Sequence, residues 1–179
     1  QPLHSNFGKT SKKDVYYRCR AYTKFEELES ADAGLAKQWR ENRRELYYGS
    51  LKQFLRAMAD SSLDEHFSLT LFPINFSDSM GHYTLLNPDN QRDVSRKDLS
   101  IITLTNNRFR LYFDDFLKIV NKQNPWQISY MQVMGGSIDF DVRGNYYGIQ
   151  PVVLSGYWSD LRFAGALPSD YRPDGDLTE

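Results

Sequence analysis

Cysteine is nearly absent from this 179-residue sequence, in which Cys19 is the sole representative. No disulfide can form within the chain, and no metal site can be built from several thiolates. Cys19 lies in the strand-like run YYRCRAY, where a small buried side chain is its commonest role. A catalytic thiol would need a histidine partner, and His4, His66 and His82 carry no local signature of one.

Long apolar runs are missing too. No stretch approaches the roughly 18 apolar residues of a membrane-spanning helix, and the first residues lack the apolar centre of a signal peptide. Because the chain begins at Gln1 and not at methionine, we expect a mature or trimmed product. Any membrane association would then come through a segment that is not in this chain.

A surplus of either charge is also lacking, because 22 basic and 23 acidic residues leave a formal net charge of -1. This balance offers no electrostatic attraction for nucleic acid or for an acidic membrane surface, so we expect no nucleic-acid partner. Aromatic residues are plentiful, with 12 Tyr, 11 Phe and 3 Trp, many in alternating contexts that favour strands.

Catalytic and cofactor motifs are absent as well. Gly135-Gly136 lacks the Lys and Ser/Thr of a phosphate-binding loop, and Ser155-Gly156 lacks the G-x-S-x-G frame of a nucleophile elbow. The histidines lack the H-E-x-x-H spacing of zinc peptidases. We therefore predict no catalytic residue, no cofactor and no metal site.

Asp139 and Asp141 are the most suggestive acidic pair, because alternate residues of a strand point the same way. As a calcium loop the segment fails, since Arg143 occupies the fifth position and Gln150 the twelfth, where a bidentate glutamate is needed. We expect instead a solvent-facing strand edge that ends in an Asx-type turn.

The stretch Lys37 to Met58 predicts one long amphipathic helix, running to about Ala59. Its apolar arc is predicted to pack on the sheet, and its basic residues, Lys52 and Arg56 among them, to face solvent. The residues of this arc are Leu35, Trp39, Leu46, Tyr47, Phe54, Ala57 and Met58.

Arg43 and Ser50 lie on that apolar arc, and Gly49 lies beside it. A guanidinium stays charged, so we expect Arg43 to be mostly buried against a carboxylate or several backbone oxygens. The alternatives are stacking on an aromatic ring, anchoring of an external anion, and extension of the side chain to solvent. A glycine in mid-helix costs about 1 kcal/mol relative to alanine, which suggests that another element passes close to Gly49.

Residues 1–13 read as a flexible lead-in, residues 14–171 as a single domain, and residues 172–179 as an acidic tail. Strands are expected at Val15–Tyr22 and Phe67–Phe72, in a hairpin across Asn106-Asn107, and in several later runs. The segment 75–98 is expected to be a long loop. A final helix, capped by Ser155, is expected at Gly156–Leu167.

These elements follow one another mostly in hairpin order, which predicts an α+β fold. We expect an antiparallel sheet of about six strands, packed against one long helix in the N-terminal half and a short C-terminal helix.

Several motifs together resemble a known family. They are FEEL at Phe25–Leu28, W-x-x-N-R-R-E at Trp39–Glu45, Y-Y-G-S at Tyr47–Ser50, F-L-R at Phe54–Arg56, S-G-Y-W ending at Trp158, and L-P-S-D-Y ending at Tyr171. The chain resembles, over roughly Tyr22 to Tyr171, the uncharacterised module of carboxypeptidase-regulatory-like domain-containing proteins of the Gram-negative cell envelope. Those proteins usually carry an N-terminal β-sandwich that this chain lacks, so it is either a fragment or a divergent relative.

The resemblance implies a periplasmic or cell-surface location, with a cytoplasmic one as the alternative, and it supplies no catalytic residues. We expect a non-catalytic interaction or structural module whose partner is another envelope protein or further domains of the same polypeptide. The alternative is an enzyme, for example a hydrolase that uses carboxylates assembled by the fold. The residues expected to form a structural or interaction site are Trp39, Arg43, Gly49, Ser50 and Trp158.

Overall fold

The computed structural model describes residues 25, 31–76, 83–85, 90–113, 115–133, 136–147, 152–161 and 165–173. The predicted lead-in at 1–13, the predicted strand Val15–Tyr22 and residues 174–179 of the predicted tail lie outside these residues. The helices are α1 (Ala33–Tyr47), α2 (Leu51–Asp60), α3 (Leu63–His66) and α4 (Tyr157–Leu161), with a 3-10 helix at Arg96–Asp98. The strands are β1 (Phe67–Phe72), β2 (Ile74–Phe76), β3 (Tyr83–Leu85), β4 (Arg92–Val94), β5 (Ser100–Thr103), β6 (Arg108–Tyr112), β7 (Phe116–Asn121), β8 (Ile128–Val133), β9 (Ser137–Asp141), β10 (Tyr146–Tyr147) and β11 (Val152–Gly156).

The strands form two large antiparallel sheets. The five-stranded sheet has the order β11-β8-β7-β1-β4, and the four-stranded sheet has the order β10-β9-β6-β5; β2 and β3 form a separate pair. Neighbouring strands pair throughout in antiparallel register. The predicted α+β class, with a longer helix in the N-terminal half and a short C-terminal helix, is confirmed.

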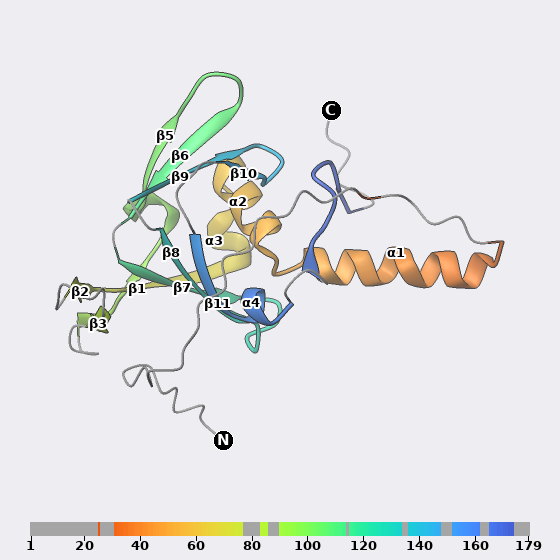
Figure 1. The fold of residues 1–179 in the computed structure, drawn as a ribbon, viewed down its shortest axis with the longest axis horizontal. Coiled ribbons are helices and arrows are strands. Elements are labelled where there is room, and N and C mark those ends of the chain that lie inside the picture. Colours follow the sequence, from red (N-terminus) through yellow and green to blue (C-terminus); the bar gives the residue numbers. More distant parts are fainter. Residues whose placement is uncertain are drawn as a thin grey trace.

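The predicted single helix is wrong in one respect, because the chain forms two helices separated by Tyr48, Gly49 and Ser50. Gly49 has φ +84°, in the left-handed region, which no helix can continue through. The two helices also differ in their surroundings. In Figure 1, α1 extends away from the part of the molecule that contains the sheets, whereas α2 lies within it.

The helix that packs against the sheets is α2. Phe54, Leu55 and Met58 are fully buried, and the Phe54 ring meets that of Phe67 on β1 edge to face at 5.5 Å between centroids. In α1, by contrast, Tyr47 is the one buried residue. The scaffold role expected of the whole stretch Lys37 to Met58 therefore belongs to its second half.

The hairpin across Asn106-Asn107 is confirmed. Strands β5 and β6 pair with Ile101 opposite Leu111, and Asn106 and Asn107 have φ of 62° and 56°, the left-handed conformation that asparagine tolerates. Leu111 of β6 is fully buried.

The segment 75–98, expected to be a loop, contains strand structure. Strand β4 pairs with β1, and Thr70 Oγ1 donates to Asp93 Oδ1 at 2.9 Å. The 3-10 helix that follows is attached to α2, because Arg96 Nε donates to the carbonyl of Met58 at 2.8 Å. The sequence did not reveal β4 because this edge strand has two polar residues in succession, Arg92 and Asp93, and so lacks the alternation of apolar and polar residues that indicates a strand.

The final helix is shorter than predicted. Ser155 and Gly156 belong to strand β11, which pairs with β8, and α4 is described from Tyr157 to Leu161. Residues 166 and 167, within the predicted helix, are not helical, and residues 162–164 lie outside the described residues. Gly156 has φ +73°, and this left-handed residue ends the strand and begins the helix.

Candidate functional site

The junction between α1 and α2 is held by a helix cap. Ser50 is the N-cap of α2, and its Oγ accepts a hydrogen bond from the backbone nitrogen of Gln53 at 3.1 Å. The Gln53 side chain reaches back, so that its Oε1 accepts from the backbone nitrogen of Gly49 at 2.7 Å. This reciprocal arrangement is a variant of the capping box, and it starts α2 at Leu51.

Gly49 lies against the end of β7 and the turn that leads into β8. A Cβ atom added there would overlap the Gln127 Oε1 atom and would lie 2.6 Å from Asn121 Nδ2. Asn121 Nδ2 in turn donates to Gln127 Oε1 at 2.6 Å. The expectation that another element passes close to Gly49 is therefore confirmed.

Trp158 connects α4 to the same junction. Its indole Nε1 donates to the carbonyl oxygen of Gly49 at 2.6 Å, and the side chain is 7% exposed. The indole packs beside the Phe54 ring at 5.4 Å between centroids, and the Trp158 backbone nitrogen donates to Ser129 Oγ. Segments distant in sequence thus meet at Gly49.

The fold brings Gly49, Ser50 and Trp158 together, as a cluster of buried and hydrogen-bonded groups. Within the described ranges, every buried side-chain nitrogen and oxygen has a hydrogen-bond partner. A hydrogen-bonded network of this kind fixes the geometry of a junction. We assign these residues a structural role.

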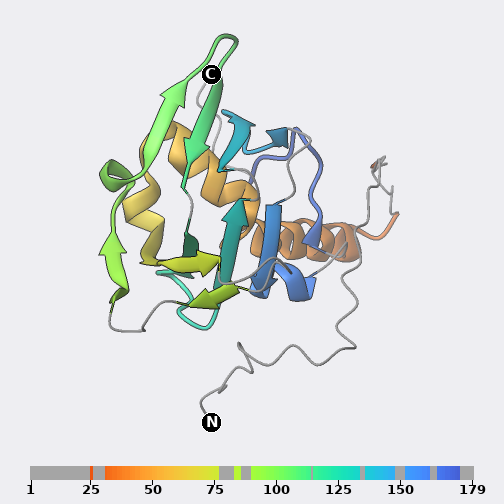
Figure 2. The same ribbon diagram turned by 60° about the vertical axis from the view of Figure 1, so that its left-hand side comes forward.

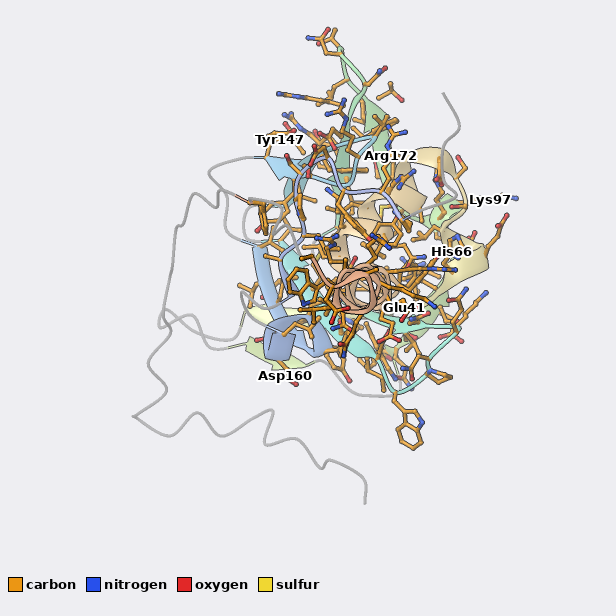
Figure 3. The ribbon with its side chains drawn as sticks, turned by 90° about the vertical axis from the view of Figure 1, so that its right-hand side faces the viewer. Glu41, His66, Lys97, Tyr147, Asp160 and Arg172 are labelled. Carbon is orange, nitrogen blue, oxygen red and sulfur yellow. The ribbon has the colours of Figure 1, made fainter. Side chains whose placement is uncertain are left out.

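Trp39 and Arg43 are not part of that cluster. Both lie on α1 and are only partly buried, while Leu35 on the same helix is 38% exposed. The predicted carboxylate or backbone partner of Arg43 stays a prediction. Figure 1 shows α1 extending away from the sheets, and Figure 3 views it end-on, near the label of Glu41. The apolar residues of α1 are therefore less covered than those of α2, of which Phe54, Leu55 and Met58 are fully buried.

An open depression of about 220 Å³ lies along α1, lined by Glu41, Arg44, Glu45 and Tyr48. The Arg44 guanidinium stands 6.0 Å from the centre of the Tyr48 ring. Lys37 and Glu41, one turn apart on α1, form an ion pair with 3.7 Å between Nζ and Oε1. A depression formed by successive turns of one exposed helix lacks the enclosing walls of a catalytic pocket.

Lys52 on α2 was expected to face solvent, and the structure places it otherwise. Its Nζ donates to Asn145 Oδ1 and to the carbonyl oxygen of Ser169, both at 2.8 Å. Burial lowers the pKa of Lys52 to about 8, although the Asp141 carboxylate acts in the opposite sense. The helical wheel was misleading here because the turn after β9 and the segment 165–173 both reach the polar side of α2.

This shift predicts a specific pH dependence. Because the pKa of Lys52 is lower in the folded chain than in the unfolded chain, the unfolded state binds more protons between about pH 8 and 10.5, and folding stability contributed by this group rises with pH there. Lys52→Met should remove that rise. The measurement is the free energy of unfolding in urea, determined for variant and parent at several pH values between about 8 and 10.5. Lys37→Met, on the exposed side of α1, serves as the matched control. If the free energy of unfolding changed equally with pH in the parent and in Lys52→Met, the prediction would be contradicted.

Asp141 forms the predicted Asx-type turn. Its Oδ1 accepts from the backbone nitrogens of Arg143 and Asn145, both at 2.9 Å, and its Oδ2 accepts from the Tyr147 hydroxyl at 2.7 Å. Burial alone raises the pKa of Asp141, but the hydrogen bonds from Tyr147, Asn145 and Arg143 outweigh it, and the pKa lies below its ordinary value. The carboxylate is thus engaged within its own turn.

Asp139 is engaged as well. Both of its oxygens accept from Arg110, with 2.7 Å between Nη2 and Oδ2, and this pairing lowers the pKa of Asp139. Strand β9 lies between β10 and β6, so the prediction of a sheet edge at this position is wrong. In the part of the chain that the structure describes, no group of three His, Cys, Asp or Glu side chains is placed to hold a metal ion.

Sequence reasoning missed three residues of this junction. Gln53 had a readable signal, because Ser50 and Gln53 have the S-x-x-Q spacing of a capping box. Asn121 and Gln127 had none, since their role depends on contact with a distant glycine.

None of the helices described is long and apolar enough to cross a membrane. Comparison of the chain with protein-family models, with curated proteins and with solved structures finds no match.

Proposed function

We propose that this chain is a non-catalytic interaction module of a membrane-associated cell-envelope protein. Its partner is another envelope protein or further domains of the same polypeptide, and membrane association comes through a segment outside this chain. The envelope location is supported by the resemblance of the motifs at Trp39–Glu45 and Tyr47–Ser50 to the envelope-protein module described above. The interaction role is supported by the exposure of the apolar residues of α1.

The observation that carries the proposal is a 15-residue helix with one buried residue, Tyr47. Isolated helices of about 12–15 residues are marginal in water, and most helices in proteins are stabilised by packing of an apolar face. Leu35 is 38% exposed, and Trp39 and Leu46 are only partly covered. A partner that covers this face would supply the packing that the chain itself does not.

The alternative of a carboxylate-dependent enzyme receives less support. Asp139 is paired with Arg110, and Asp141 is hydrogen-bonded within its own turn. The depression along α1 is open, and Lys52, whose pKa is shifted, is not among the residues that line it. Asp139 and Asp141 are likewise not among the residues that line it.

Cysteine labelling tests both parts of the proposal. Leu35→Cys probes the α1 face, and Lys97→Cys is the matched control, because Lys97 is exposed and lies apart from α1 in Figure 3. Both variants are made in a Cys19→Ser background, in the isolated chain and in the full-length gene product in its native envelope. We expect maleimide to label Leu35→Cys at least about tenfold more slowly in the full-length protein, a difference of about 1.4 kcal/mol, and Lys97→Cys equally in both.

The same variants report the compartment. A maleimide that does not cross the inner membrane should label Lys97→Cys in intact cells, if the module is extracytoplasmic. Labelling only after lysis would overturn the envelope location. Equal labelling of Leu35→Cys in the isolated and the full-length protein would overturn the assignment of α1 as the covered face.

A further inference from the structure

The two large sheets end in edge strands of different character. An edge strand presents unpaired backbone groups to solvent, and proteins usually protect such an edge with charge, shortness, bulges or a covering element. Strand β4 carries Arg92 and Asp93, β10 has two residues, and β11 contacts α4. Strand β5 has the sequence SIIT, without charge, proline or glycine.

Strand β5 is also accessible. It pairs with β6 on one side and stands at the end of its sheet, within the ranges that the structure describes. The β5–β6 hairpin projects from the body of the molecule in Figures 1 and 2. Ile102 is 48% exposed, and Ser100 and Thr103 are exposed as well. The edge therefore offers a β-branched, uncharged strand that another strand can reach.

The pairing within the hairpin shows which backbone groups face outward. The Leu104 nitrogen donates to the Arg108 carbonyl at 2.7 Å, which marks this pair as a hydrogen-bonded one. Bonded and non-bonded pairs alternate along an antiparallel ladder, so Ile102, opposite Arg110, also directs its groups toward β6. The N–H and C=O groups of Ile101 and Thr103 then point to the open edge.

We propose that β5 pairs antiparallel with β5 of a second copy of this chain, with Ile102 opposite the second copy's Ile102. In this register the outward groups of Ile101 meet those of the second copy's Thr103, and hydrogen bonds form in both directions. The two Ile102 residues form a non-hydrogen-bonded pair, in which side chains are closer, with about 4.5 Å between Cα atoms. The same register thus gives hydrogen-bond partners to the outward backbone groups of Ile101 and Thr103, and it covers Ile102, the most exposed apolar side chain of β5.

Charge near the seam does not oppose this contact. Strand β5 has no charged residue, so its twofold repetition brings no like charges face to face. Arg110, which neighbours Ile102 on β6, is neutralised by Asp139 through two hydrogen bonds. A second copy is favoured as the occupant because the strand is complementary to itself in backbone pattern, in side-chain face and in charge.

The seam is short, so the dimer is expected to be weak and dependent on concentration, as for interfaces below about 1,200 Å². It also uses a surface other than α1. If the chain does not dimerise through β5, the proposed function of α1 is unaffected. If α1 does not bind a partner, the proposed dimer is unaffected.

The test compares two substitutions at one position. Thr103→Pro removes the outward N–H group, which an edge strand tolerates, whereas Thr103→Val keeps it. Sedimentation velocity of the parent chain from about 10 µM to 1 mM should show the mass rising from 20.9 kDa toward twice that value, a range suited to weak affinity. Thr103→Pro should weaken association at least about tenfold, and Thr103→Val should stay within about twofold of the parent.

Circular dichroism and amide dispersion in NMR spectra serve to check that both variants are folded. A second measurement does not depend on proline: Ile102→Cys in the Cys19→Ser background should form a disulfide-linked dimer under mild oxidation. Ser100→Cys should not, because the register holds the two Ser100 Cα atoms at least about 13 Å apart, beyond disulfide reach. A parent chain that stays monomeric at every concentration, equal association of the two Thr103 variants, or equal cross-linking at positions 100 and 102 would each overturn the proposal.

Discussion

Gly49→Ala is expected to lower the free energy of unfolding by about 3 kcal/mol. Gly49 has φ +84°, a conformation that costs an L-residue about 1–2 kcal/mol. An added methyl group would also overlap the Gln127 side chain and press on Asn121, and overpacking of this kind costs about 1–3 kcal/mol. Chemical unfolding in urea, with two-state analysis, measures the loss.

Gly34→Ala is the matched control for that substitution. Gly34 lies in the first turn of α1, and its nearest neighbour, Asp32 Oδ1, would be 3.1 Å from an added Cβ. Alanine favours helix by up to about 1 kcal/mol over glycine, so this variant should be neutral or slightly stabilising. A loss below about 1 kcal/mol for Gly49→Ala would show that the junction rearranges easily and is not the fixed point described above.

Phe54→Ala should produce a loss of about 4 kcal/mol, the second large effect. Phe54 is fully buried and its ring contacts those of Phe67 and Trp158, so truncation removes apolar burial and leaves a cavity at the meeting point of α2, β1 and α4. The thermal or urea midpoint of the variant, compared with that of the parent, gives the value.

Trp39→Ala provides the comparison from the other half of the predicted helix. Trp39 is a larger side chain, but it is only partly buried on α1, and we expect a loss of about 1 kcal/mol in the isolated chain. Trp126→Ala, at a position 92% exposed, should change stability by less than about 0.5 kcal/mol. A Trp39→Ala loss as large as that of Phe54→Ala would mean that α1 packs on the body after all.

Local sequence signals predicted the features that local chemistry decides. Asn106-Asn107 adopts left-handed backbone angles because asparagine tolerates them at small cost, and the hairpin follows from that pair. Asp141 forms its turn with backbone nitrogens two and four residues away, so no distant partner is needed. The α+β class followed from the order of such segments.

The candidate site was predictable only in part. The S-x-x-Q spacing from Ser50 to Gln53 marks a helix start, but the apolar periodicity that continues across it gave the opposite indication. Periodicity reports which side chains are apolar, and it does not report a change in chain direction. Trp158 was expected to matter, yet its partner, the carbonyl of Gly49, belongs to a distant segment that no local pattern identifies.

The stretch Lys37 to Met58 shows the division most clearly. Helix propensity and apolar periodicity are properties of the residues, so the amino-acid sequence was enough to predict that the stretch is amphipathic and helical on both sides of Gly49. The three-dimensional fold was needed to show that the helix divides at Gly49, that α2 is buried while α1 projects, and that Lys52 donates to Asn145 and Ser169. Burial and hydrogen-bond partners depend on which distant segments contact a residue, and the contacts with β7, α4 and the segment 165–173 are a property of the whole fold.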